Sequence, residues 1–219
     1  MNDLFEVVEH SWADEVSGQG DVELLSLILN DASHSQGIGE PYSRCNTAQN
    51  LLKKAGSLRN LLSEPEQYFN VAEVQRIYGL KELFSRFLEQ KLEREPALTS
   101  PELTRNFLMA KLRDLKHEVF SLLYLDNQHR VIKYEELFRG TIDGAAVYPR
   151  EVVKKALANN AAAVILVHNH PSGIAEPSHA DRAITERLKK ALELVDIRTL
   201  DHLIVGDGYC DSFAERGWL

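Results

Sequence analysis

The stretch Ala161-Ala-Ala-Val-Ile-Leu-Val-His168-Asn-His170-Pro-Ser-Gly decides how the fold of this 219-residue chain is interpreted. Its apolar part, bounded by two asparagines before it and by Pro-Ser-Gly after it, indicates a buried strand that ends at the first histidine. Side chains two positions apart in a strand point to the same side, so His168 and His170 can reach one cation together. We therefore expect a metal site at the end of this strand.

Asp181 supplies a third candidate ligand a short distance downstream. Imidazole nitrogen and carboxylate oxygen, at roughly 2.0 to 2.2 Å, are ligands of catalytic zinc sites, which leave a fourth tetrahedral position to water. Two neutral histidines and one carboxylate leave the ion with net positive charge, which lowers the pKa of that water toward about 7. We expect His168, His170 and Asp181 to bind Zn²⁺ in this way.

Ser178 and Asp181 also have the spacing of a helix capping box, with Asp in place of Glu. Apolar residues recur at helical spacing over 179–195, so Ser178 is expected as the N-cap of a helix with Asp181 in its first turn. A purely structural role for the three residues is the alternative to metal binding. The two roles are compatible, because the positive end of a helix dipole favours an ionised carboxylate.

The same residues carry a family resemblance. The pattern His-x-His-Pro, followed by Ser178 and Asp181, resembles the JAMM motif of JAB/MPN-type metalloproteases, in the variant of the bacterial RadC family. The resemblance is dense from about Pro101 to the C-terminus and thin before it. Its supporting segments are 138–141 (Phe-Arg-Gly-Thr), 147–153 (Val-Tyr-Pro-Arg-Glu-Val-Val), 168–173, 201–206 (Asp-His-Leu-Ile-Val-Gly) and 212–217.

This resemblance implies a JAB/MPN-like mixed sheet flanked by helices and a zinc-dependent hydrolase acting on an amide or isopeptide bond. It also implies a glutamate upstream of the ligands as general base, and the matching position is Glu118, just before the strand-like segment 119–125. Such a carboxylate can take a proton from the attacking water and deliver it to the departing nitrogen. Competing candidates are Glu135, Glu136 and Glu151.

Ser178 has two expected roles. Its hydroxyl can donate a hydrogen bond to the oxyanion of a tetrahedral intermediate, or it can serve only as the helix cap. His202 lies on an expected strand, and we interpret it as a packed or hydrogen-bonded residue rather than a fourth ligand. A zinc deaminase is excluded by ligand supply, because that class needs a Cys-x-x-Cys pair and this chain has two cysteines far apart, Cys45 and Cys210.

The chain is expected to form two domains. Prolines interrupt a charged, helix-like pattern near residues 93–102, which divides a smaller all-helical domain (1–95) from an α/β domain with a mixed sheet (96–219). The expected helices are residues 21–29, 47–54 and 71–92 in the first domain and 100–111, 149–159 and 179–195 in the second. Hairpins are expected around residues 126–129 and 206–208.

RadC-like chains carry an N-terminal region that resembles a helix-hairpin-helix, which implies DNA contact. This sequence departs from that pattern, because Gly79 stands alone where the hairpin has Gly-x-Gly, and Gly37-Ile-Gly39 lacks a following basic residue before Arg44. Either segment can be only a turn. Residues 1–100 contain 9 Lys and Arg against 16 Asp and Glu. This acidic half therefore has few cationic side chains to bind DNA phosphates. Arg105, Lys111, Arg113 and Lys116 lie close together in sequence and could form a local basic patch for DNA, or simply the solvated face of a helix.

Three functions from different classes follow. The first is a zinc metallohydrolase of the JAMM metallopeptidase type with a peptide or protein substrate. The second is a DNA-repair-associated protein that binds or processes nucleic acid, with DNA or a repair protein as partner, and the third is a non-catalytic scaffold. The N-terminus shows no export signal and no run has the length of a membrane span, so we expect a cytoplasmic protein without a membrane partner and consider a homodimer.

Overall fold

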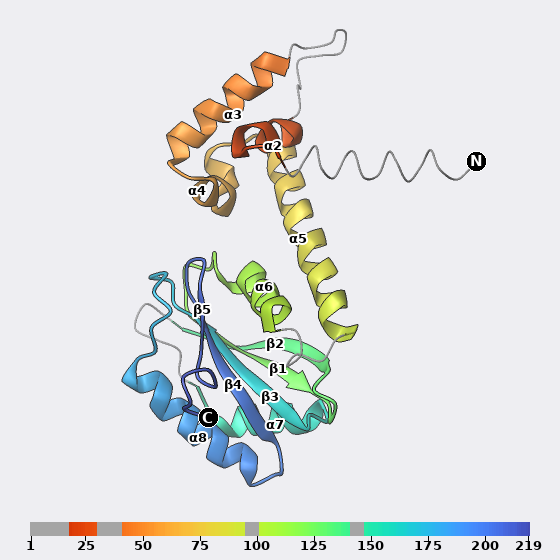
Figure 1. Cartoon of the computed structure of the whole chain (residues 1–219), viewed down its shortest axis with the longest axis vertical. Helices are drawn as coiled ribbons and strands as arrows, with labels where there is room; N and C mark the ends of the chain where they lie inside the picture. Colours follow the sequence, from red (N-terminus) through yellow and green to blue (C-terminus); the bar gives the residue numbers. More distant parts are fainter. Residues whose placement is uncertain (1–17, 30–40, 95–100, 141–146) are drawn as a thin grey trace, which may run out of the picture. The chain divides into compact units, whose positions relative to one another are not determined.

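A computed structural model describes residues 18–29, 41–94, 101–140 and 147–219. Its contacts group the chain into two compact units, Met1–Glu82 and Leu83–Leu219, and each is considered by itself. The division falls within helix α5 (Val71–Arg94), shown in Figure 1. The boundary expected between residues 95 and 96 lies outside the described residues, as does Gly37-Ile-Gly39.

The described part of the first unit is helical. It contains α2 (Asp21–Ile28), α3 (Pro41–Ala55), α4 (Leu58–Ser63), a 3₁₀ turn η1 (Pro65–Gln67) and the start of α5. Helix α4 was not expected, because a single capped helix of 6 residues is too short to show a periodic pattern. Gly79 lies inside α5, so the interpretation of this segment as a turn was wrong. Its helical neighbours outweigh the cost of about 1 kcal/mol that glycine adds within a helix.

The second unit contains a five-stranded mixed sheet in the order β2-β1-β3-β4-β5, which confirms the expected α/β class. Its elements are α6 (Pro101–Leu112), β1 (Val119–Leu125), β2 (Val131–Arg139), α7 (Pro149–Ala158), β3 (Ala163–Asn169), α8 (His179–Glu193), β4 (Arg198–Val205) and β5 (Cys210–Ser212). Only β3 and β4 pair in parallel, and α8 makes the crossover between them. The hairpins joining β1 to β2 and β4 to β5 are antiparallel, as expected.

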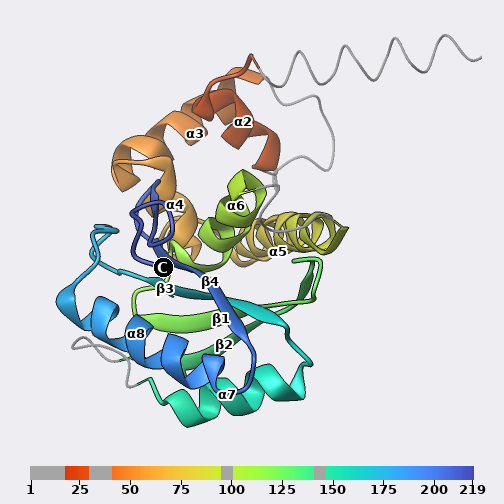
Figure 2. The same cartoon turned by 60° about the horizontal axis from the view of Figure 1, so that its bottom comes forward.

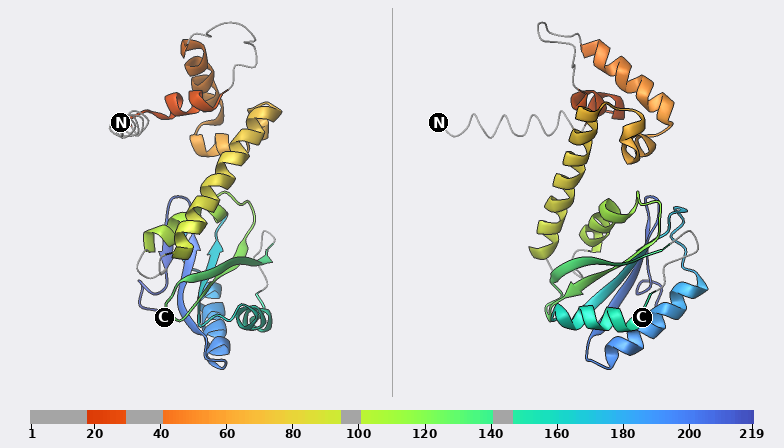
Figure 3. Two further views of the ribbon diagram at one scale, coloured as in Figure 1. Left: turned by 90° about the vertical axis from the view of Figure 1, so that its right-hand side faces the viewer. Right: turned by 180° about the vertical axis from the view of Figure 1, so that it is seen from behind.

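The two faces of the sheet carry separate apolar cores. In β3, Ala163, Ile165 and Val167 face one cluster, which includes apolar residues of α6. Val164 and Leu166 face the other, which includes apolar residues of α7 and α8. Figure 2 shows α7 and α8 on one side of the sheet and α6 on the other, and Figure 3 shows the twist of its strands. Because side chains alternate along a strand, His168 falls on the α7/α8 side.

Candidate metal centre

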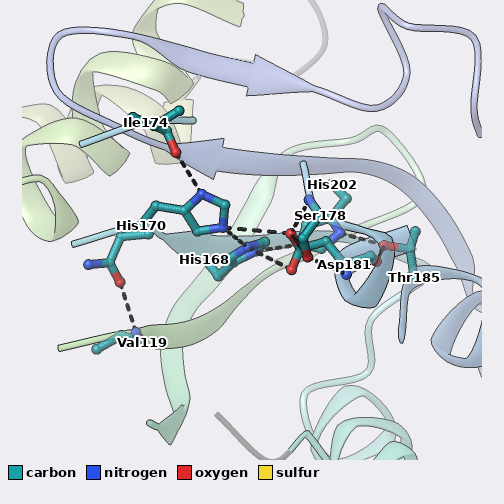
Figure 4. A network of polar contacts seen from close by, with 9 residues as sticks. Val119, His168, His170, Ile174, Ser178, Asp181, Thr185 and His202 are labelled. Atoms are coloured by element: carbon teal, nitrogen blue, oxygen red, sulfur yellow. Dashed lines mark hydrogen bonds and ion pairs between the residues drawn. The ribbon is translucent and has the colours of Figure 1, made fainter. Parts of the chain in front are cut away.

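Strand β3 brings the two histidines together at its C-terminal end. The Nε2 atoms of His168 and His170 lie 3.0 Å apart. The Nδ1 atom of His170 lies 2.7 Å from the carbonyl oxygen of Ile174. A dashed line marks this contact in Figure 4. A carbonyl oxygen can only accept a hydrogen bond, so this contact requires a proton on Nδ1 of His170. In the neutral ring, Nε2 is therefore free to bind a metal.

The start of α8 places Asp181 beside both histidines. Ser178 caps the helix: its Oγ accepts a hydrogen bond from the Asp181 N–H at 3.1 Å, and the Ser178 N–H donates to Asp181 Oδ2 at 2.7 Å. The predicted capping box is thus confirmed. Asp181 Oδ1 lies 3.1 Å from His168 Nε2, and Oδ2 lies 3.6 Å from His170 Nε2. The Ser178 hydroxyl also donates to Asp181 Oδ2 at 2.6 Å, while its oxyanion role stays a prediction.

The charges at this site are coupled. Burial by itself raises the pKa of the Asp181 carboxyl, but the adjacent imidazole rings of His168 and His170 outweigh this effect and hold the pKa far below its usual value. In return, the hydrogen bond to Asp181 raises the pKa of His170 above that of an ordinary histidine. Asp181 is therefore ionised at neutral pH, which is the state a metal ligand needs.

Glu118 joins this group from the position just before the neighbouring strand β1. Strand β1 runs antiparallel to β3 with Phe120 opposite His168, so continuing that register places Glu118 opposite His170. The four residues Glu118, His168, His170 and Asp181 each offer a ligand atom, and these atoms lie within 4.8 Å of one another. The structure therefore brings together the expected ligands and the glutamate that matches the general base.

The competing glutamates have other partners. Glu135 accepts hydrogen bonds from Lys155 Nζ at 2.8 Å and from the Tyr124 hydroxyl at 3.0 Å. Glu136 accepts from Arg139 at 3.1 Å, and Glu151 lies 3.9 Å from Lys154 Nζ. Among the described residues, the metal-type group contains none of these three glutamates.

A third histidine, His202, is fully buried and contacts the Nδ1 atom of His168. His202 Nε2 is 2.8 Å from His168 Nδ1, and His202 Nδ1 is 2.6 Å from the Thr185 hydroxyl on α8. Burial lowers the pKa of His202 well below its ordinary value. These contacts confirm the expectation that His202 is a hydrogen-bonded residue. Thr185 was missed, because a threonine within a helix gives no sequence signal of such a role.

Asn169, which separates the two histidine ligands, was also missed. Its side chain is buried and makes hydrogen bonds to the backbone around the start of β1. Asn169 Oδ1 accepts a hydrogen bond from the Val119 N–H at 2.8 Å, and Nδ2 donates one to the His117 carbonyl oxygen at 3.1 Å. Its position between the two histidines was the one sequence feature that could have indicated this role. These two bonds hold the residues on either side of Glu118 against the end of β3.

The donor set fits a zinc ion. Ligand atoms about 2.1 Å from a tetrahedral ion lie about 3.4 Å from one another. The two Nε2 atoms lie 3.0 Å apart, His168 Nε2 lies 3.1 Å from Asp181 Oδ1, and His170 Nε2 lies 3.6 Å from the other oxygen, Oδ2. These separations bracket that value. Two imidazoles and one carboxylate are also the ligand types that catalytic zinc accepts.

The fold and this site define a class: an α/β domain with a His-x-His and aspartate metal-type centre at the end of a buried strand. The chain belongs to the RadC-like JAB domain family, whose family model matches residues 98–218. It is 52% identical over 205 residues to a UPF0758 protein of Aliivibrio fischeri strain MJ11, covering 91% of this chain and 89% of that protein. A UPF0758 protein of Aeromonas hydrophila is 50% identical over 208 residues, with 92% and 90% covered.

Proposed function

We propose that this chain is a zinc-dependent metallohydrolase that cleaves an amide or isopeptide bond in a peptide or protein. The observation that carries the proposal is the convergence of Glu118 with His168, His170 and Asp181. The last three would hold the ion. A zinc ion there would supply Lewis acidity and lower the pKa of the attacking water toward about 7.

Glu118 would move the proton. Its carboxylate lies within reach of the same centre and, in the described part of the chain, is the fourth member of the metal-type group. A base in this position takes a proton from water as the water attacks the carbonyl carbon, and then gives that proton to the departing nitrogen. Nitrogen is a poor leaving group until it is protonated, so this second transfer is what an amide requires.

The surroundings favour this function over phosphodiester cleavage. Nucleases with two metal ions hold them about 3.5 to 4 Å apart, whereas the described residues contain one metal-type group. The basic cluster that would contact phosphates is largely paired with acids: Arg105 with Glu215, Lys111 with Glu89 and Arg113 with Asp207. Neutralised cations contribute little to phosphate binding.

A non-catalytic scaffold would differ from the proposed hydrolase in the number of protein ligands that bind the zinc ion. Structural zinc is bound by four protein ligands, which would require Glu118 to be a ligand. In the parts that the structure describes, no helix is both long and apolar enough to cross a membrane.

The experiment that tests the proposal compares Glu118→Gln with wild type in zinc content and in cleavage of peptide and isopeptide libraries followed by mass spectrometry. We expect full zinc content and loss of cleavage by at least about 100-fold, in the range of a lost general base. Glu186→Gln, an exposed change on α8, is the matched control and should cleave like wild type. Loss of zinc from Glu118→Gln would make Glu118 a ligand and favour the scaffold. Undiminished cleavage would refute its role as base.

A further inference from the structure

We propose that Thr185 and His202 form a positioning relay that fixes His168 in the tautomer whose Nε2 lone pair faces Asp181 and His170. The inference rests on the proposed function, because it assigns to this pair the task of presenting a metal ligand. The relay runs from Thr185 on α8 through His202 on β4 to His168 on β3, and Figure 4 labels these three residues.

The direction of the relay is set at Thr185. The Thr185 Oγ1 atom lies 2.5 Å from the carbonyl oxygen of Asp181, one helical turn earlier. A carbonyl oxygen has no proton to give, so the threonine hydroxyl donates its single proton there. Toward His202 Nδ1, 2.6 Å away, the hydroxyl oxygen can then only accept. His202 therefore carries its proton on Nδ1.

The tautomer of His202 in turn determines the tautomer of His168. Its ring is fully buried, with the rings of Phe120 and Phe213 at centroid distances of 5.7 and 4.8 Å. The partners of the ring are a hydroxyl and another imidazole, and burying a charged imidazole without a carboxylate is costly. A neutral His202 with its proton on Nδ1 has a lone pair on Nε2.

That lone pair accepts from His168. The His202 Nε2 and His168 Nδ1 atoms are 2.8 Å apart, so His168 must donate through Nδ1. In neutral His168 the remaining lone pair is on Nε2, which lies 3.1 Å from Asp181 Oδ1. The carbonyl oxygen of Ile174 imposes the same tautomer on His170, so the two ligands are prepared by different partners.

The relay also joins two ligands to each other. Thr185 holds the backbone of Asp181, and through His202 it holds the ring of His168. Metal-binding histidines usually donate their second N–H to a carboxylate, a carbonyl or water. A neutral imidazole in that place accepts the same bond without adding negative charge behind the ligand.

The test begins with the metal-free wild-type protein labelled with ¹⁵N-histidine. Long-range ¹H–¹⁵N spectra distinguish the two neutral tautomers of each ring, and we expect His168 and His202 both to carry their protons on Nδ1. A proton on Nε2 of His202 would overturn the relay. This readout does not depend on metal, so a wild-type protein that binds no zinc would sink the proposed function and leave the relay to be judged by its tautomers.

The second arm measures zinc affinity by competition with a chelator in matched variants. Thr185→Val keeps the shape of threonine and removes the hydroxyl, so we expect a loss of about 10- to 100-fold, as for other groups that orient metal ligands. Thr185→Ser keeps the hydroxyl and should bind within about twofold of wild type. Equal affinity of the valine and serine variants would overturn the proposal. If Thr185→Val does not fold, the proposal stands or falls on the histidine tautomers measured in the wild-type protein.

Discussion

Asn169 Oδ1 accepts a hydrogen bond from the backbone N–H of Val119 at 2.8 Å, which ties the residue between the two histidine ligands to the residue after Glu118. The candidate base lies just before β1, far in sequence from the candidate ligands at the end of β3 and the start of α8. This buried amide is one of the contacts that keeps them in register.

We predict that Asn169→Ala separates metal binding from catalysis. The change leaves the buried Val119 N–H and the part-buried His117 carbonyl group without their partner, and a buried unsatisfied group costs about 1 to 3 kcal/mol. We expect a loss of at least about 1 kcal/mol in the free energy of unfolding in urea and strongly reduced cleavage, with zinc still bound. Wild-type cleavage in this variant would show that Glu118 is held by other contacts.

Zinc binding should depend on pH through His170. Because the hydrogen bond to Asp181 raises the pKa of His170, the metal-free site keeps a proton to higher pH than an ordinary histidine would. Zinc must displace that proton, so its apparent affinity should fall by up to about tenfold per pH unit below this raised pKa. Titration calorimetry at pH 6, 7 and 8 in two buffers would measure affinity and proton release. Affinity that is constant over this range would contradict the coupling.

Glu135→Gln should affect stability and spare activity. Burial raises the pKa of the Glu135 carboxyl, but hydrogen bonds from Lys155 and Tyr124 outweigh burial and lower it. A lowered pKa stabilises the fold above the pKa of the unfolded state, and this stabilisation is lost as pH falls through the folded value. We expect the variant to be less stable by about 1 kcal/mol at pH 7, with the difference from wild type vanishing in acid.

Urea unfolding at pH 7 and pH 3, with cleavage assays at pH 7, would check this prediction. Loss of cleavage in Glu135→Gln without loss of stability would return Glu135 to the list of candidate bases.

Cys210 should be chemically inert in the folded protein. Burial raises the pKa of its thiol to about 12, so little thiolate is present near neutral pH. Iodoacetamide at pH 8 should leave Cys210 unmodified in native protein and modify it after unfolding in urea, as measured by peptide mass spectrometry. Rapid alkylation without urea would show that this end of the sheet opens.

The sequence predicts those parts of the site that depend on local pattern. Strand β3, the two histidines at its end and the capped start of α8 with Asp181 all lie within one short stretch, where strand alternation and cap spacing are sufficient. The start of α8 at His179 is as expected. The end of a helix is less well marked, and α8 ends two residues before the expected position.

Other parts of the site depend on long-range pairing, which no single sequence reveals. Glu118 meets His170 because β1 and β3 pair in one particular register, and its assignment from sequence rested on the family resemblance. The contact between Thr185 and His202 likewise requires α8 to pack on β4. The periodicity of α8 could indicate its buried face, but it could not indicate which strand residue that face meets.

The most direct test of the account is anomalous diffraction at the zinc edge from crystals grown with saturating zinc. We predict one peak about 2.0 to 2.2 Å from His168 Nε2, His170 Nε2 and an Asp181 oxygen, with no fourth protein atom bound to it. The absence of a peak among these three side chains, or a peak whose fourth ligand is Glu118 or another protein group, would contradict a catalytic metal centre in this protein.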